Sequence, residues 1–196
     1  MGNKRRLATA LVSPALLRAR GDAPDKHSVQ VVIETARGAR NKMAYDQEIG
    51  AFRLKKVLPE GMTFPYDFGF VPSTLADDGD PIDALVLMDE PAAMGCVVNC
   101  RIIGAILGEE TEGKKSWRND RLIAVAIPSH THGDLKRVDD LNATLLEELE
   151  QFFVNYQAVE GRKFRVLGCK GPKKARALIA KAARRWRKQR EARAGR

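Results

Sequence analysis

Cysteine and histidine are scarce in this 196-residue chain. The three cysteines, Cys96, Cys100 and Cys169, form no C-x-x-C pair, so neither a disulfide framework nor a cysteine-rich zinc site is indicated. We therefore expect a reducing compartment, the cytoplasm. His130 and His132 have the i, i+2 spacing of two zinc ligands on one strand face, but no third ligand lies near them, and we expect a loop role.

Long apolar runs are missing as well. No stretch approaches the roughly 20 residues that a membrane-spanning helix needs. With 44% hydrophobic and 30% charged residues, the composition is that of a soluble globular protein rather than a disordered one. The length favours one domain with peripheral additions, and no internal repeat is evident.

Acidic residues are unevenly distributed, and this explains the net charge of +9. Residues 170–196 hold twelve Lys or Arg and one Glu, whereas residues 1–169 hold 22 basic and 24 acidic residues. The excess basic charge is therefore a property of the tail. We divide the chain into a basic N-terminal extension (1–24), a main domain (25–170) and a basic C-terminal helix (171–196).

Both terminal segments leave alternatives open. The first twenty residues are basic and free of acids, which fits either an organelle transit peptide or a frayed extension. The C-terminal segment, with its clustered Lys and Arg, fits binding to a polyanion such as nucleic acid or an anionic membrane surface. It fits equally a solvated helix docked through Ile179 and Trp186.

The main domain has the pattern of a small β-protein. Short β-branched segments, separated by Gly, Pro, Asn or Asp, occur at 29–34, 51–58, 83–89, 95–106 and 121–128. No helical pattern lies between them, so we predict a compact barrel or sandwich.

Helical periodicity appears only late in the chain. Residues 139–157 predict an amphipathic helix on the barrel, with Asp139 or Asp140 as its cap. Residues 172–192 predict a second helix with a narrow apolar face. The Gly-, Glu- and Lys-rich stretch 108–117 predicts an exposed loop.

Three carboxylates crowd into the stretch Asp78-Gly-Asp80-Pro-Ile-Asp83, directly before an apolar strand. Close carboxylates repel and raise one another's pKa values unless cations neutralise them, and Mg²⁺ or Mn²⁺ prefer such oxygen ligands. An acidic surface turn is the alternative, because Asp-Gly and Asp-Pro are ordinary turn pairs. A calcium EF-hand loop is disfavoured because Asp83 stands where that loop needs Gly.

The wider pattern resembles a known family. The run DGDPIDALVLMDEP is preceded by VVIE, NKMAYDQEIGAFRLKKVL and FPYDFGFVPSTL and is followed by NDRLIAVAIP and FFVNYQ. In order and spacing these segments, over residues 28–170, resemble the family I soluble inorganic pyrophosphatases. The resemblance implies a mainly β, α+β fold: a five-stranded OB-like β-barrel with helices packed outside. It also implies hydrolysis of pyrophosphate to two phosphates and a homo-oligomer, for which a hexamer is one form.

The resemblance also implies a metal site. Asp78 and Asp83 would bind Mg²⁺, with Mn²⁺ or Zn²⁺ as substitutes, and Asp80 would be the general base that takes a proton from water. Glu110, or Glu109, and Asp120 are the counterparts of further metal ligands. A count back from the following strand without a gap puts Asn119 in the place given to Asp120.

A phosphate-binding set follows from the same comparison. Lys42 matches a family lysine, Lys56 stands at an arginine position, Arg121 replaces a lysine, and Tyr156 matches a tyrosine on the late helix. Glu34 matches the supporting acid that ends the first strand. Because Lys56 shares the strand parity of Phe52 and Leu54, we expect it to point inward, toward an anion.

Four positions depart from the family pattern. Ala44 replaces a glutamate, Phe64 and Phe68 replace tyrosines, and Gln157 replaces a lysine. We expect activity that is reduced or altered in specificity. Two other readings stay open: a catalytically weakened relative that binds metal and phosphate, and an OB-like nucleic-acid-binding module that uses the basic tail.

Overall fold

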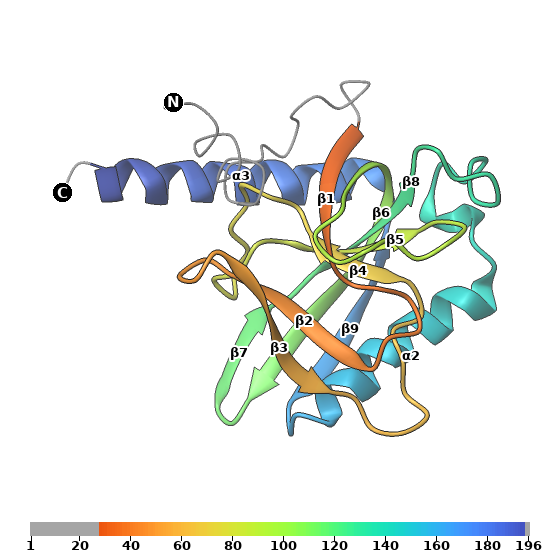
Figure 1. Cartoon of the computed structure of the whole chain (residues 1–196), viewed down its shortest axis with the longest axis horizontal. Helices are drawn as coiled ribbons and strands as arrows, with labels where there is room; N and C mark the ends of the chain where they lie inside the picture. Colours follow the sequence, from red (N-terminus) through yellow and green to blue (C-terminus); the bar gives the residue numbers. More distant parts are fainter. Residues whose placement is uncertain (1–27, 195–196) are drawn as a thin grey trace, which may run out of the picture.

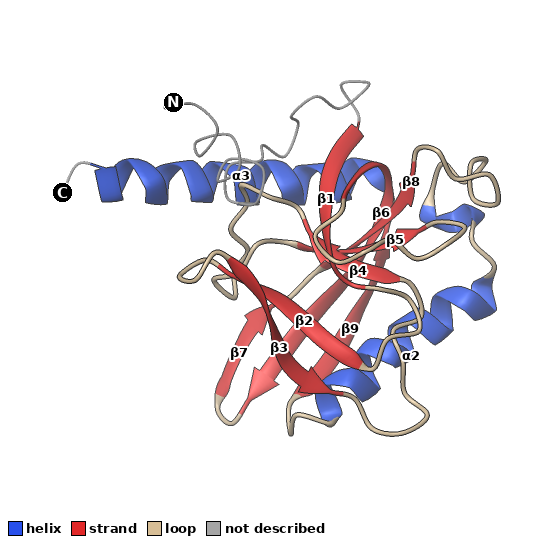
Figure 2. Cartoon of the chain, viewed as in Figure 1, coloured by secondary structure: helices blue, strands red, loops and turns tan. Residues whose placement is uncertain are grey.

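The computed structural model describes residues 28–194, and five of its strands form a closed ring (Figures 1 and 2). Successive pairings join the strands into the ring, and the last pairing returns to the first strand. In ring order the strands are β1 (Ser28–Thr35), β4 (Asp67–Phe70), β5 (Asp83–Leu87), β8 (Arg121–Ala126) and β6 (Val97–Glu112). The predicted five-stranded architecture is therefore confirmed.

The core divides between the two faces of the ring strands, because successive side chains of a strand point to opposite sides. On β5, Ala84 and Val86 join one cluster, which includes Ile179 of the C-terminal helix. Leu85 and Leu87 join the other cluster, which includes the aromatic residues Phe153 and Tyr156 of the helix that comes before the C-terminal helix in the chain. Both faces are covered, so β5 and β8 are apolar along almost their whole length.

One predicted ring strand lies elsewhere. Residues 51–58 contribute β3 (Ala51–Val57), which pairs with β2 (Asn41–Asp46) in a separate two-stranded sheet. Its place in the ring is taken by β4, a strand of four residues that is too short to show an alternation of apolar and polar side chains. Exposed Leu54 and Val57 explain the error: β3 is apolar in composition without being buried.

The predicted loop at 108–117 is also wrong. Strand β6 continues to Glu112 and turns back at Gly113 into β7 (Lys115–Arg118), forming a hairpin. Gly113 has φ +59°, a left-handed conformation that glycine adopts without a Cβ penalty. Strand β9 (Lys163–Lys170), which the sequence did not reveal, pairs with the other edge of β6.

Two helices and a short 3₁₀ turn complete the described part of the chain, residues 28–194. Helix α2 (Ala143–Ala158) follows the 3₁₀ turn η2 (Val138–Asp140). The side chain of Asn142 caps α2 by accepting a hydrogen bond of 2.8 Å from Thr144 N. The expected caps, Asp139 and Asp140, are thus incorrect; Asp140 instead accepts from the backbone of the preceding turn.

Helix α3 (Pro172–Ala194) lies across the ring and projects past the strands at its C-terminal end (Figure 1). Ala175, Ile179 and Ala182 are buried against the ring. Asp77 forms ion pairs with Lys181, at 3.2 Å, and with Arg185 of this helix. Within residues 28–194, no helix combines the length and apolarity needed to cross a bilayer. The proposed N-terminal extension and transit peptide lie outside the described residues.

Candidate active site

The loop between β4 and β5 carries the aspartates and is folded by local hydrogen bonds. Thr74 Oγ1 donates to Val71 O (2.5 Å) and accepts from Ile82 N (3.0 Å), which clamps the two ends of the loop together. Between them, Asp78 Oδ1 accepts from Asp80 N at 3.0 Å, and Gly79 has φ +97°. A side chain at Gly79 would be strained, so glycine is required for this turn.

Asp83 and Arg121 come together because β5 and β8 run in parallel. They are partners in the register, each at the first position of its strand, and their side chains form an ion pair of 2.5 Å. Arg121 is only 3% exposed. A buried guanidinium needs an anionic partner, and Asp83 supplies it.

The three aspartates of this loop (Asp78, Asp80 and Asp83), here called the aspartate group, carry negative charge that is only partly neutralised. Burial is the main cause that raises the pKa of Asp78 to about 6; the charges of Asp83 and Asp80 act in the same direction, and the hydrogen bond from Asp80 N and the charge of Arg121 oppose them. Burial also raises the pKa of Asp83, opposed by Arg121 and Lys42. These are the electrostatics of a cation site, although no three acidic, His or Cys side chains among residues 28–194 converge on one point.

Lys42 lies beside the aspartate group in an enclosed position. Its Nζ is 2.9 Å from Glu34 Oε2 and 4.4 Å from the centre of the Phe68 ring. Glu34 Oε1 accepts in turn from Tyr45 N at 2.7 Å, which holds the carboxylate in place. Lys42 and Glu34, which the resemblance implied separately, therefore form a buried ion pair.

Lys56 does point inward, but for a different reason than strand parity. The register of β2 and β3 shifts between Lys42 and Met43, so that Lys42 faces Lys56 whereas Met43 faces Leu54. This bulge turns Lys56 away from the half-exposed Leu54. Its Nζ lies 2.6 Å from Glu160 Oε1 and 3.5 Å from the centre of the Tyr156 ring.

Tyr156 connects the core with the charged groups. Its ring packs in the cluster of α2, with its centre 5.6 Å from that of Phe64. Burial raises the pKa of its hydroxyl, and the charges that act on it are those of Glu160, Arg121, Asp83 and Glu34. The neutral hydroxyl of Tyr156 therefore lies near both acidic and basic groups of the site.

Glu110 enters the site from β6, and Glu109 does not. Glu109 pairs at 2.8 Å with Arg165 on the surface. Glu110 is 1% exposed and accepts from three donors: Asn119 Nδ2 at 2.6 Å, Gln157 Nε2 at 3.0 Å and Arg162 at 3.0 Å. Of the two predicted alternatives, only Glu110 lies with the other site residues.

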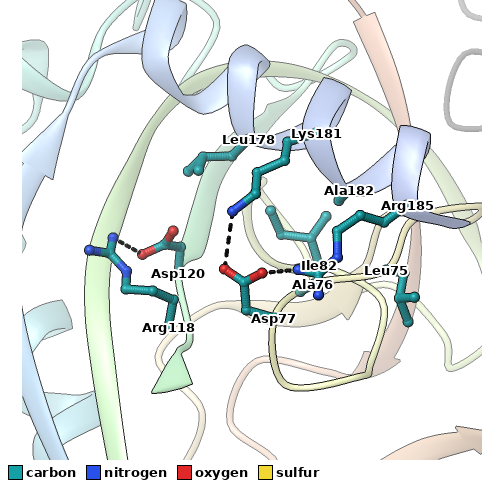
Figure 3. A pocket seen from close by; sticks show the side chains of 10 residues that line it. All are labelled: Leu75, Ala76, Asp77, Ile82, Arg118, Asp120, Leu178, Lys181, Ala182 and Arg185. Atoms are coloured by element: carbon teal, nitrogen blue, oxygen red, sulfur yellow. Dashed lines mark hydrogen bonds and ion pairs between the residues drawn. The ribbon is translucent and has the colours of Figure 1, made fainter. Parts of the chain in front are cut away.

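The structure separates Asp120 from the site. Arg121 faces Asp83, so the adjacent Asp120 points to the opposite side of the chain. There it accepts from Arg118 at 2.5 Å and lines a small cavity beneath α3 together with Asp77 and Lys181 (Figure 3). Asn119 lies in the site instead, between Glu110 and Arg121. This is the residue reached by counting back from β8 without a gap.

Three of the four departures from the family pattern are on inward-facing residues. Phe64 and Phe68 are buried with their ring centres 5.4 Å apart, so each contributes to the core instead of offering a hydroxyl. Gln157 donates to Glu110.

Sequence reasoning missed Glu160 and Arg162, whose only signal is their place in a charged turn just after an aromatic helix.

His130 and His132 lie in a loop held by Asp89. The carboxylate of Asp89 accepts from the backbone N–H groups of His130 and Thr131, at 2.8 and 2.9 Å. His132 Nδ1 is 2.8 Å from Thr131 Oγ1. These contacts support the loop role.

The site thus places an anionic end, the aspartate group, next to a cationic end formed by Lys42, Lys56 and Arg121. Such an arrangement suits a ligand that brings both divalent cations and phosphate oxygens.

Comparisons with known proteins show the family of this chain. The family model described as inorganic pyrophosphatase matches residues 31–187. A Nostoc sp. protein named inorganic pyrophosphatase is 36% identical over 156 residues, covering 80% of this chain and 90% of its own length. The crystal structure of the Thermus thermophilus inorganic pyrophosphatase superposes with a TM-score of 0.79 at 34% identity, covering 90% of this chain and 98% of that one. The chain therefore belongs to the inorganic pyrophosphatase family.

Proposed function

We propose that this protein hydrolyses inorganic pyrophosphate to two phosphates, with Mg²⁺ as the preferred metal and Mn²⁺ or Zn²⁺ as substitutes. The observation that carries this proposal is the aspartate group beside buried Arg121 and Lys42, in a chain of the inorganic pyrophosphatase family. Carboxylates whose pKa values are raised by burial and by one another favour a cation, and the adjacent basic side chains favour an anion.

Asp78, Asp80 and Asp83 are the residues that would hold the metal. When bound, Mg²⁺ lowers the pKa of a water ligand and offsets charge on the phosphate oxygens. Asp80 is the exposed member of the group, and we assign it the role of general base, which accepts the proton of the attacking water. Arg121 fixes the position of Asp83 through their ion pair.

Lys42, Lys56, Arg121 and Tyr156 form the proposed phosphate-binding set. Each lysine is already paired with a glutamate, Lys42 with Glu34 and Lys56 with Glu160, so the glutamates orient the ammonium groups. The neutral hydroxyl of Tyr156 can donate a hydrogen bond to a phosphate oxygen. We leave Glu110 and Asp120 out of the metal set, because Glu110 already has three donors and Asp120 lies beneath α3.

Phosphate release from pyrophosphate with and without Mg²⁺ tests the proposal. The wild type should release phosphate only with the metal, and Asp80→Asn should lower kcat by roughly 10²- to 10⁴-fold, the range for loss of a general base. Asp134→Asn, which changes an exposed aspartate in another loop, is the matched control and should keep full activity. Equal rates for wild type and Asp80→Asn would reject the assigned base. Parallel assays with nucleotides and polyphosphate define the substrate range.

The catalytically weakened relative is the second candidate. Phe64 and Phe68 favour it, because two hydroxyls implied by the resemblance are replaced by buried rings. Titration calorimetry that shows binding of pyrophosphate in the presence of Mg²⁺, without phosphate release, would establish it. The homo-oligomer, with a hexamer as one form, and the cytoplasmic location stay predictions of the sequence.

A further inference from the structure

Glu110 is a buried carboxylate whose two oxygens are both occupied by protein donors. Oε2 accepts from Asn119 Nδ2 (2.6 Å) and Gln157 Nε2 (3.0 Å), and Oε1 accepts from Arg162 at 3.0 Å. Its side chain is 2% exposed. A charge buried this deeply must be compensated, and here the compensation comes from a guanidinium and two amides.

Asn119 allows Glu110 to be buried without a metal ion beside it. Its Nδ2 donates to Glu110, and its Oδ1 accepts from Arg121. An aspartate at this position would place a second carboxylate against Glu110, and two close carboxylates need a cation between them. The amide removes that need and connects Glu110 to the arginine that pairs with Asp83.

Arg162 supplies the positive charge of the cluster. It follows α2 in the turn before β9, and its guanidinium lies 3.0 Å from Glu110, 3.4 Å from Glu112 and 3.7 Å from Glu160. Gln157, where the resemblance implies a lysine, contributes only a neutral donor. The cationic role next to Glu110 therefore belongs to Arg162.

We propose that Arg162 takes the place of a divalent cation at Glu110, so that this protein binds its metal ions at the aspartate group alone. The residues Glu110, Asn119, Gln157 and Arg162 form a metal-free, hydrogen-bonded support for Arg121. Removal of the guanidinium frees the carboxylates of Glu110, Glu112 and Glu160, which Arg162 pairs with, to bind a divalent cation in its place. The inference deepens the proposed function, since it assumes that the aspartate group is the metal site.

Equilibrium binding of Mn²⁺, followed by the electron paramagnetic resonance of the free ion, tests this directly. Glu110→Gln should leave the number of Mn²⁺ ions bound per chain unchanged. Arg162→Met should add one ion per chain, and the double variant Glu110→Gln/Arg162→Met should lose it again. Arg165→Met is the matched control: it removes a neighbouring arginine that pairs with exposed Glu109, and it should add no ion.

Each result decides the question. Loss of one Mn²⁺ in Glu110→Gln, or no added ion in a folded Arg162→Met, overturns the proposal. Arg162→Met leaves a buried carboxylate without its counterion, and this can unfold the protein. Circular dichroism therefore checks that the Arg162→Met variant is folded. If it does not fold, the Glu110→Gln count alone decides: an unchanged number of ions supports the proposal.

Failure of the proposed function gives a different pattern. A wild type that releases no phosphate, while Arg162→Met still gains a Glu110-dependent Mn²⁺ ion, refutes the activity and leaves this inference standing.

Discussion

Asp83 and Arg121 face each other at the first positions of two neighbouring parallel strands, with 2.5 Å between the carboxylate and the guanidinium. Through Arg121 the pair connects the aspartate group to the hydrogen-bonded residues Asn119 and Glu110. Because parallel pairing sets its position, the geometry of the pair does not depend on flexible loops.

Removal of the guanidinium tests how strongly the pair matters. Arg121→Met leaves Asp83 without its counterion, and we expect the free energy of unfolding of the metal-free protein to fall by about 3 to 5 kcal/mol. Mg²⁺ should restore more stability to the variant than it adds to the wild type. Urea unfolding with and without Mg²⁺ measures both effects.

Arg53→Met is the control for this experiment. Arg53 also pairs with an aspartate, Asp46, but its side chain is 53% exposed, so the change should cost no more than about 1 kcal/mol. An equal gain from Mg²⁺ in Arg121→Met and wild type would contradict the linkage between the pair and the metal site.

The raised pKa of Asp78 predicts a pH dependence of stability. In the unfolded chain this carboxyl ionises near its ordinary value of 3.8, whereas in the folded protein its pKa is about 6. Between these values the folded state holds the extra proton, so the free energy of unfolding of the metal-free protein should fall as the pH rises from about 4 to 6. Asp78→Asn should remove this contribution.

Metal binding should show the opposite trend. Cations bind the ionised carboxylate, so the rise in Tm caused by Mg²⁺ should be large above pH 6 and should shrink as the pH falls below it. Thermal unfolding of wild type and Asp78→Asn from pH 5 to 8, with and without Mg²⁺, measures both trends. A rise in Tm that is independent of pH would argue against Asp78 as a ligand.

Lys56 should contribute mainly to substrate binding. Lys56→Met removes a cation from the proposed phosphate-binding set, and we expect KM for pyrophosphate to rise by about tenfold, equivalent to 1.4 kcal/mol, with a smaller change in kcat. Lys56→Arg should restore binding, because a guanidinium also pairs with phosphate. Lys55→Met, which changes the exposed neighbour, should leave both constants unchanged. A loss of kcat with unchanged KM would instead assign Lys56 to the chemical step.

Gly69 should be essential for closure of the ring. A Cβ at this position of β4 would lie 1.9 Å from Val32 O of the neighbouring β1, a contact that only backbone movement can relieve. We expect Gly69→Ala to destabilise the protein by more than about 3 kcal/mol, the range of severe core disruptions. Gly171→Ala, at an open position, should change the free energy of unfolding by less than about 0.5 kcal/mol in the same urea titration.

The C-terminal part of α3 provides a test of the polyanion-binding hypothesis. Arg187, Lys188 and Arg190 belong to the part of the helix that follows its buried face. We expect their replacement by Gln to weaken binding to duplex DNA and to reduce the slope of log K against log salt by about 3, roughly one unit per lost phosphate contact. Asp80→Asn should bind DNA as the wild type does. Equal and weak binding by all variants would dismiss the hypothesis and leave α3 a solvated helix.

The sequence predicted the fold class because it depends on local patterns of apolar and turn residues; the roles given to the site residues stay predictions. The D-x-D-P-x-D run keeps Asp78, Asp80 and Asp83 within six residues of one another in any fold. The aromatic period of α2 likewise placed Tyr156 on the inward face of the helix, as found. Lys56 was expected inward, and a bulge rather than strand parity makes it so.

Other features were decided by contacts between segments far apart in the chain. Residues 51–58 look like a ring strand, but the four-residue β4 takes that place, because membership of the ring is set by pairing with β1 and β5 rather than by composition.

The chain by itself determined that three aspartates share one loop of a small β-protein, because neighbours in sequence stay neighbours in space. Only the tertiary structure decided which charges meet them. Parallel pairing of β5 and β8 brings Arg121 to Asp83 and turns Asp120 toward α3, and the turn after α2 brings Arg162 to Glu110. Burial then raises the pKa values of Asp78 and Asp83, and burial is a property of the packed molecule.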